Sequence, residues 1–402
     1  MVIKKGHSTE SILIKITNDI LIASDKKTAT VLLLLDLSAA FDTVDVNALL
    51  HILNVEIGIK DNALRWFSSY LTNRTMRVKI NQSFSDVFVL KFGLPQGSVL
   101  GHVLFNIYLR SIYKLVESHG FNIKGFADDH QLYVSFVPLF QSHYLGEKIN
   151  CILNEVTLWM NTYFLKLNAG KTQIIVFGPS SIRNDVTING IFIDYNNTCI
   201  RFRNVVKNLG VFLDSDMSYA HQINSCVSSV FLTIKSISKI SSFLSKKEKC
   251  TLVCSLVLSK LDYCNSLYYG TNAILLKKLQ YAQNCAARLI YKLRKYDHVS
   301  DIFTDLHWLP IKSRIIFKIL LFVHKSMYST SPDDINNLLM IESTRTFDLR
   351  IVKTNSVYGD RAFSAAAGRL WNPLPRYLKI EPCVEKFKKL LKTHLFNNIG
   401  IN

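Results

Sequence analysis

Residues 31–45 have the sequence VLLLLDLSAAFDTVD, and this stretch decides the fold. The continuous apolar run from Val31 to Leu35 is typical of a strand that is buried on both faces of a sheet. Asp36 follows directly at the end of this run. A carboxylate at the edge of a core strand is unusual, because burying charge is costly. Asp36 is therefore the first candidate functional residue.

A second acidic element is the pair Asp128 and Asp129, within the sequence GFADDH of residues 125–130. Alternating runs at 121–127 and 131–136 flank the pair, which predicts a hairpin with both aspartates at its tip. If this hairpin lies beside strand 31–35, three carboxylates converge and can hold two Mg²⁺ ions for in-line displacement at a phosphate. Taken alone, the pair is better explained by turn chemistry, because Asp tolerates tight turns.

Hydrophobic periodicity divides the chain near residue 216. Before that point it predicts helices at 8–24, at 47–71, after Ser98 and at 149–163, a strand at 173–177, and hairpins at 74–91 and 199–213. From about residue 219 helical periodicity dominates. A polar stretch at 329–334 then indicates a loop or linker to a C-terminal segment. The chain is therefore expected to be of the α+β class.

The 402-residue chain has a formal net charge of +18, which is concentrated in its second half. Residues 1–220 contain 21 Lys and Arg against 18 Asp and Glu, whereas residues 221–402 contain 27 against 12. Such a basic region suits a polyanion that is held without sequence recognition, since phosphate neutralisation supplies most non-specific affinity for nucleic acid. A surface that merely keeps the protein in solution is the alternative.

The eight cysteines include no Cys-x-x-Cys pair, so neither a zinc module nor a disulfide framework is expected. All apolar runs are shorter than the roughly 18 residues of a membrane span. The first residues also lack the apolar core of a secretory signal. We therefore expect an intracellular protein of the nucleus or cytoplasm, without membrane association.

Five motifs occur in a fixed order, and together they carry a resemblance to a known family. They are LDLSAAFDTVD (35–45), GLPQGSVLG (93–101), FADD (126–129), LKLNAGKT (165–172) and NLGV (208–211). These closely resemble palm motifs A to E of the reverse transcriptases of non-LTR, LINE-type retrotransposons. The sequences QYAQNCAARLI (280–290) and LHWLP (306–310) resemble the region after the palm, so the similarity covers nearly the whole chain.

The resemblance implies an RNA-directed DNA polymerase that adds dNTPs to a DNA primer on an RNA template, with two Mg²⁺ ions or possible Mn²⁺ substitutes. It implies a right-hand polymerase palm, an antiparallel sheet with packed helices, at 31–215. A residual fingers segment is expected at 1–30, a basic helical thumb at 216–328, and a C-terminal helical segment of unknown role at 329–402. No partner protein is implied.

Transferred position by position, the resemblance assigns roles to residues around the three aspartates. Asp36 and Asp128 match the principal metal ligands, Asp129 a supporting one, and the Leu37 carbonyl a further one. Phe41 matches the aromatic residue that blocks a ribose 2′ hydroxyl, although a packed core Phe is the alternative. Three further roles are assigned: Gln96 and Gly97 lie near nucleotide and template, Lys171 lies beside the departing pyrophosphate, and Asn208, Leu209 and Gly210 form the primer grip. For Gln96 and Gly97 a plain helix-entry turn is the alternative, and for Lys171 an ordinary exposed lysine.

Basic residues of the helical region are candidates for contact with backbone phosphates. They are Arg288, Lys292, Arg294, Lys295, Lys312 and Arg314. Any one of them could instead be a solvated surface charge. Asp42 and Asp45, within the first motif, are interpreted as local turn and helix-capping residues.

The match departs from the family in three places. Only 35 residues precede Asp36, so we expect most of the fingers and the whole endonuclease domain to be missing. His102 stands where proline is usual, and His130 where threonine is common; His130 could add positive charge at low pH. A catalytically inactive, retrotransposon-derived remnant that only binds nucleic acid is therefore the alternative. A generic metal-dependent hydrolase is disfavoured, because it explains the carboxylates but not the later motifs.

Overall fold

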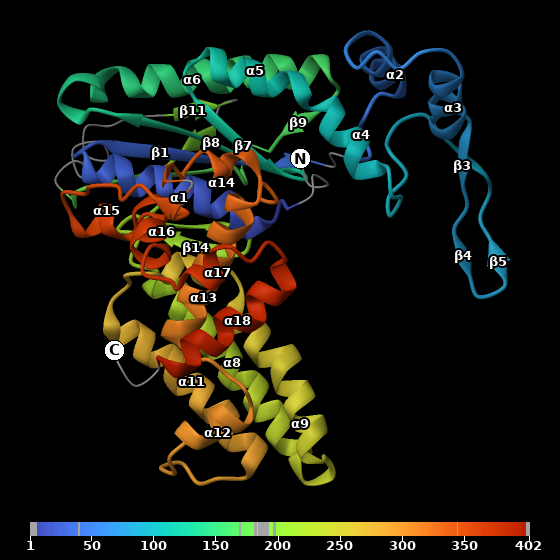
Figure 1. Ribbon diagram of the computed structural model, residues 1–402. Helices are drawn as coiled ribbons and strands as arrows, with labels where there is room; N and C mark the ends of the chain where they lie inside the picture. Colours follow the sequence, from blue (N-terminus) through green and yellow to red (C-terminus); the bar gives the residue numbers. More distant parts are fainter. Residues whose placement is uncertain are drawn as a thin grey trace. The chain divides into compact units, whose positions relative to one another are not determined.

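A computed structural model of the protein describes residues 6–38, 41–168, 170–180, 183, 193–195, 198–343 and 345–398. These residues form two compact units. Unit 1 contains residues 30–176 and the described residues from 183 to 203, and unit 2 contains residues 6–29, 177–180 and 204–398. Both units combine helices with strands (Figure 1), so the expected mixed class is confirmed. None of the described helices has the length and apolar character that crossing a bilayer requires.

Unit 1 is built on a four-stranded sheet with the order β10-β1-β8-β7. Its strands are β1 (Ala29–Leu35), β7 (Asn122–Phe126), β8 (Asp129–Phe136) and β10 (Gln173–Phe177). Val31, Leu32 and Leu33 are successive residues of β1, and all are buried. Since successive side chains point to opposite faces, β1 is covered on both faces, as its apolar run predicts. β7 and β8 pair antiparallel with Phe126 opposite Asp129, which confirms the predicted hairpin.

Two long helices, α5 (Arg110–Ser118) and α6 (Pro138–Thr162), lie along one face of this sheet (Figure 1). The predicted helix at 149–163 is thus confirmed, although it begins earlier. The helix predicted at 47–71 is two helices, because the chain turns between them at Gly58, whose φ is +82°. The other elements of unit 1 are β2 (Leu37–Ser38), α2 (Val46–Val55), α3 (Asp61–Leu71), α4 (Gly101–Tyr108), β9 (Lys166–Leu167), β11 (Ile193–Tyr195) and β12 (Thr198–Ile200).

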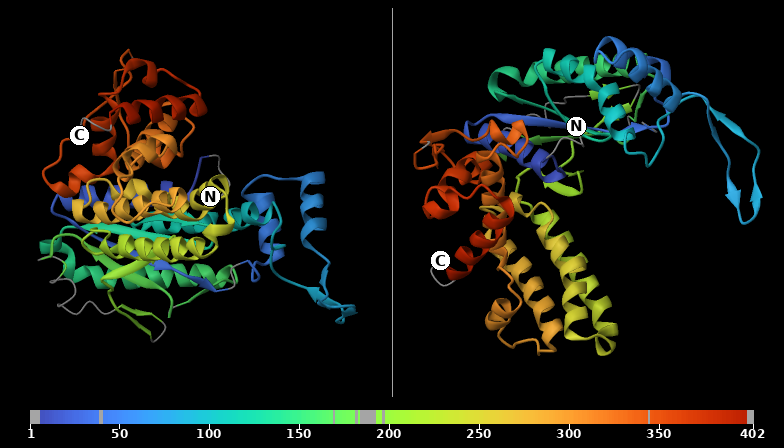
Figure 2. Two further views of the ribbon diagram at one scale, coloured as in Figure 1. Left: turned by 90° about the horizontal axis from the view of Figure 1, so that it is seen from below. Right: turned by 45° about the vertical axis from the view of Figure 1, so that its right-hand side comes forward.

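A slender hairpin follows α3 and projects away from α2 and α4 (Figure 2). It consists of β3 (Arg74–Met76) paired with β6 (Phe88–Leu90), and of β4 (Lys79–Ile80) paired with β5 (Ser83–Phe84). Asn81 has a φ of +54° in the connecting turn, where the sequence predicts it. The hairpin exposes large apolar side chains, among them Ile80 and Phe84 at 70% and 60%.

The loop after this hairpin is tied to the segment that follows β2. Gly93 N donates to the Val44 carbonyl at 2.8 Å, and Leu94 N donates to the Phe41 carbonyl at 2.8 Å. Gly93 has a φ of +87°, and a Cβ atom there would lie 2.9 Å from the backbone oxygen of Asp42. A glycine is therefore required for both its backbone angle and its close approach.

Unit 2 is mainly helical after one hairpin, β13 (Val205–Asn208) with β14 (Val211–Asp214). Its long helices match the predicted periodicity and confirm it: α8 (Ala220–Ile240), α9 (Lys246–Val253), α11 (Ala273–Tyr291) and α13 (Ile311–Met327). A π-helical turn (Cys254–Leu258) joins α9 to α10 (Ser259–Asp262). Shorter elements are η1 (Ser241–Phe243), η3 (Asn265–Tyr268) and α12 (Ser300–Asp305).

The C-terminal segment of unit 2 packs on α1 (Thr9–Asp25), the helix predicted at 8–24. The Asp25 carboxylate accepts hydrogen bonds from Asn355 N at 2.9 Å and Ser356 Oγ at 2.7 Å. The Asn18 side chain accepts one from Ser364 N at 2.9 Å. The segment contains α14 (Asp333–Asn336), β15 (Ile341–Ser343), β16 (Asp348–Leu349), α15 (Val357–Arg361), α16 (Phe363–Trp371), α17 (Arg376–Lys379) and α18 (Val384–Asn397).

The Gly93 loop supplies a stability prediction. Gly93→Ala adds a steric clash to the backbone cost of a positive φ, whereas Gly97→Ala, with φ +76° and open space around the new Cβ, adds only the backbone cost. We expect Gly97→Ala to cost about 1–2 kcal/mol of unfolding free energy and Gly93→Ala about 1–3 kcal/mol more. Urea unfolding measures both; equal losses would show that the contact with Asp42 does not constrain the loop.

Candidate active site

The pairing of β1 with β8 brings Asp36 and Asp129 to the same end of the sheet. The two strands are neighbours, and the hydroxyl groups of Thr30 and Ser135 lie 2.8 Å apart across them. Asp36 is six positions after Thr30, and Asp129 is six positions before Ser135. The charge of Asp36 raises the pKa of Asp129, which shows that the two carboxylates lie close enough to repel each other.

The β7–β8 turn places Asp128 beside them. Ala127 has a φ of +57°, and Asp128 and Asp129 follow as exposed residues at the tip. His130 points inward instead: it is buried, and its Nδ1 lies 3.1 Å from the Asp128 carbonyl oxygen. Burial lowers the pKa of His130 to about 4. His130 can therefore add positive charge only at low pH, because a buried imidazole loses solvation when protonated.

Negative charge at this end of the sheet is poorly balanced. Partial burial, then Asp128 and then Asp36, raise the pKa of Asp129. The buried Oδ2 of Asp36 accepts no hydrogen bond within the described part of the chain. Its counter-charge is the Lys171 ammonium, 3.6 Å from that oxygen on a side chain that is 69% exposed. One exposed lysine screens three carboxylates weakly.

These carboxylates suit a hard divalent cation. Within the described ranges, no three His, Cys, Asp or Glu side chains converge tightly enough to enclose a metal ion as they stand. The chemistry of the set nevertheless fits Mg²⁺, since the donors are all carboxylate oxygens, one lacks a hydrogen-bond partner, and their repulsion would be relieved by a cation. The residues that would hold it are Asp36, Asp128 and Asp129.

The strand β2 continues from Asp36 and is held by the segment that carries Lys171. Leu37 is opposite Leu167 in the β2–β9 pair, and Asn168 N donates to the Asp36 carbonyl at 2.9 Å. Asn168 also accepts a hydrogen bond from Lys171 N through its side-chain oxygen at 3.2 Å. Asn168, which the sequence interpretation did not single out, thus links the position of Asp36 to that of Lys171.

Phe41 and Gln96 lie on facing segments of unit 1. The Phe41 ring stacks on Phe105, with centroids 4.5 Å apart, and meets His102 edge-on at 5.3 Å. Gln96 Nε2 donates to the Asp42 carboxylate at 2.7 Å, a contact that no sequence spacing indicates. Gly97 is exposed, with open space where a side chain would start. Asp45 caps α2 by accepting from Ala48 N at 2.7 Å, as predicted.

The remaining candidates belong to unit 2. Leu209 and Gly210 have φ values of +45° and +81°, the pattern of a tight hairpin turn between β13 and β14. The neighbouring Asn208 is buried. Tyr263 Oη, which the sequence interpretation missed, donates to the Leu209 carbonyl at 2.7 Å and so secures the turn.

The six basic candidates of unit 2 differ in their contacts. Arg288 donates to the Asp297 carbonyl through Nε at 3.1 Å, and Arg314 donates to the Asp262 carboxylate through Nε at 2.7 Å. These two side chains therefore have internal partners. The exposed basic candidates are Lys292, Arg294, Lys295 and Lys312. Three of them follow one another closely after α11, so they offer one concentrated positive surface.

The sequence comparison identifies the family to which these carboxylates belong. The profile of the family described as reverse transcriptase (RNA-dependent DNA polymerase) matches residues 1–255. The chain therefore belongs to this reverse transcriptase family.

Curated relatives confirm the resemblance to non-LTR retrotransposons. A probable RNA-directed DNA polymerase from transposon BS of Drosophila melanogaster is 26% identical over 54% of this chain and 23% of its own length. The RNA-directed DNA polymerases from mobile element jockey of Drosophila melanogaster and Drosophila funebris are 24% and 26% identical, over 75% of this chain and 32% of their own length. The chain thus spans about a quarter to a third of these relatives.

Among solved structures, telomerase from Candida albicans aligns over 76% of this chain and 54% of its own, with a TM-score of 0.41 and 13% identity. Apo telomerase from Candida tropicalis aligns over 76% of this chain and 57% of its own, with a TM-score of 0.37 and 12% identity.

The charge imbalance supplies a prediction for Asp129→Asn. The pKa of Asp129 is raised, so its ionised form is disfavoured in the folded protein and its repulsion is felt above that pKa. Removing the charge should raise the melting temperature in EDTA at pH 7 by about 1–2 °C, and the gain should shrink as the pH falls through the raised pKa. Saturating Mg²⁺ should stabilise the wild type more than the variant.

The matched control is Asp86→Asn, an exposed position on the projecting hairpin. Calorimetric melting from pH 4 to pH 8 measures all three proteins. A stability loss in metal-free Asp129→Asn would contradict the inferred repulsion.

Proposed function

We propose that this chain catalyses RNA-directed DNA synthesis by two-metal nucleotidyl transfer, adding dNTPs to a primer 3′ hydroxyl. The observation that supports the proposal is the electrostatic repulsion of Asp129 by Asp128 and Asp36, in a chain of the reverse transcriptase family. An uncompensated carboxylate cluster is costly to a fold and is useful where cations must bind.

In this proposal Asp36 and Asp128 are the principal ligands of two divalent ions, with Asp129 and the Leu37 carbonyl in support. When bound, Mg²⁺ supplies charge neutralisation for the attacking hydroxyl and the leaving pyrophosphate. Lys171, whose exposed ammonium already approaches Asp36, would neutralise or protonate that pyrophosphate. Its link to Asn168 holds it at the edge of the cluster.

Phe41, Gln96 and Gly97 are the proposed substrate contacts. The stack on Phe105 fixes the Phe41 ring, as a residue that excludes a 2′ hydroxyl must be fixed. The Gln96 bond to Asp42 orients its amide, and the bare backbone at Gly97 permits close approach of nucleotide or template.

The wider assignments also belong to the proposal. Residues 31–215 would be the palm, 216–328 a thumb, and 1–30 the end of the fingers, with RNA template and DNA primer as partners. Asn208, Leu209 and Gly210 would position the primer end on a turn that Tyr263 secures. Asn355 and Ser364, in the segment at 329–402, bond to α1, which supports a structural role for this segment.

Primer extension tests the proposal directly. On poly(rA)/oligo(dT) with dTTP and Mg²⁺, we expect incorporation that falls by at least about a hundredfold in Asp128→Ala, because metal ions supply several kcal/mol of transition-state stabilisation. Asp86→Asn should retain activity. No incorporation, or incorporation unchanged in Asp128→Ala, would sink the proposal; template binding without incorporation would favour the nucleic-acid-binding remnant.

The exposed basic candidates supply a separate prediction for nucleic-acid binding. Each phosphate contact adds about 0.9 to the slope of log K against log salt for duplex. Changing Lys292, Arg294 and Lys295 to Gln should therefore lower that slope by roughly 2–3. A control triple at the exposed positions Lys26, Lys277 and Lys353 should leave it nearly unchanged. Fluorescence anisotropy at several salt concentrations measures the slope for each protein. Equal slopes in the two triple variants would show that Lys292, Arg294 and Lys295 do not contact nucleic acid.

A further inference from the structure

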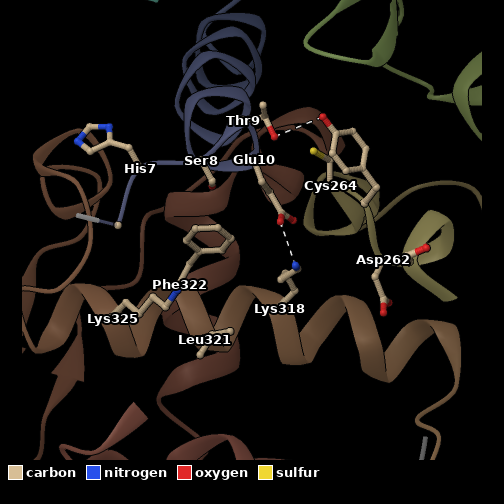
Figure 3. A pocket seen from close by; sticks show the side chains of 13 residues that line it. His7, Ser8, Thr9, Glu10, Asp262, Cys264, Lys318, Leu321, Phe322 and Lys325 are labelled. Carbon is tan, nitrogen blue, oxygen red and sulfur yellow. Dashed lines mark hydrogen bonds and ion pairs between the residues drawn. The ribbon is translucent and has the colours of Figure 1, made fainter. Parts of the chain in front are cut away.

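A cavity of about 510 Å³ lies within unit 2, and the polymerase proposal makes no use of it. Figure 3 shows the N-terminus of α1 above it and one face of α13 below. Its lining residues are Gly6, His7, Ser8, Thr9, Glu10, Ser259, Asp262, Tyr263, Cys264, Lys318, Leu321, Phe322 and Lys325. The volume is within the usual range of small-molecule sites.

The acidic groups of this pocket already have internal partners. Glu10 pairs with Lys318 at 3.1 Å and accepts from Ser266 Oγ at 2.6 Å. Asp262 pairs with Arg314. Neither carboxylate is left to attract a cation from solution, so the pocket does not favour a positively charged ligand.

Lys325 is a cation of the pocket that lacks a direct ion-pair partner in the described part of the chain, although Glu10 and Glu385 act on it electrostatically. It makes no ion pair with any described residue, whereas Lys318 and Lys388 each have a carboxylate partner. Burial, then Lys388 and Lys318, lower the pKa of Lys325. A half-buried ammonium beside two other lysines gains from an anion at hydrogen-bond distance.

The other walls suit a planar apolar group and an anion. Phe322 lines the pocket although it is only 7% exposed, and its ring centroid is 6.0 Å from the Lys325 ammonium. Tyr263, another lining residue, is 41% exposed. At the end of α1, Ser8 Oγ satisfies Ser11 N, while the N–H groups of Thr9 and Glu10 precede the first intrahelical hydrogen bond. The pocket therefore offers an aromatic surface directly beside a positive one.

We propose that this pocket binds a nucleoside phosphate, with the base against Phe322 and the phosphate at Lys325. The inference does not depend on the polymerase proposal, because none of the lining residues belongs to the carboxylate cluster. Adjacent aromatic and cationic groups match the two halves of a nucleotide, since base stacking and phosphate pairing are then satisfied together.

Isothermal titration calorimetry of the full chain with dATP in EDTA tests the proposal. EDTA removes divalent ions, so nucleotide binding at the aspartates that depends on metal does not contribute to the signal. We expect binding that Lys325→Gln weakens roughly tenfold, the effect of one lost charge-assisted contact. Lys277→Gln, at an exposed position of α11 outside the pocket, should bind as the wild type does. Unchanged melting curves confirm that both variants fold.

A second arm separates the nucleoside from the phosphate. Inorganic tripolyphosphate should bind more weakly than dATP, and Phe322→Leu should weaken dATP while leaving tripolyphosphate unchanged. Absent dATP binding, or equal binding by wild type and Lys325→Gln, would overturn the site. Tripolyphosphate binding as tight as that of dATP would overturn the nucleoside assignment.

Discussion

The mutual repulsion of three carboxylates, imposed by the pairing of β1 with β8, is the constraint on which the account of this protein depends. Thr30 and Ser135 contact each other across these two strands, and Asp36 and Asp128 both raise the pKa of Asp129 at one end of the sheet. Because the core strand β1 leads into Asp36, whose carboxylate lies beside two other carboxylates, their repulsion lowers the stability of the fold at this point. The buried, unbonded Oδ2 of Asp36 is the clearest sign of that cost.

The rest of each unit fixes its own functional segments. In unit 1, Gly93 allows its loop to contact the backbone of Asp42, and Gln96 then bonds the Asp42 side chain. Asn168 joins the Asp36 backbone to the Lys171 loop. In unit 2, the C-terminal segment bonds the end of α1 through Asp25, so residues that are 330 positions apart share one core. Each unit therefore holds these segments in place by hydrogen bonds within the unit.

Much of this arrangement could be predicted from the sequence, because it depends on periodicity. The strand at 31–35, the hairpin at the aspartate pair and the long helices of unit 2 all leave regular apolar patterns. The break at Gly58 was missed because a single permissive residue interrupts an otherwise helical pattern. The hydrogen-bond partners of Arg314 and Gln96 could not be predicted from the sequence, because residues 52 and 54 positions apart show no periodic spacing. The lowered pKa of His130 could not be predicted either, because the burial that causes it is a tertiary property.

The central claim is that this cluster exists to hold two divalent ions. Electron paramagnetic resonance of Mn²⁺ tests it most directly, by counting bound ions on the chain with dTTP and a poly(rA)/oligo(dT) duplex. The account predicts two ions per chain in the wild type and loss of both in an Asp36→Asn, Asp128→Asn double variant that still melts cooperatively. Equal Mn²⁺ binding by the two proteins would contradict it.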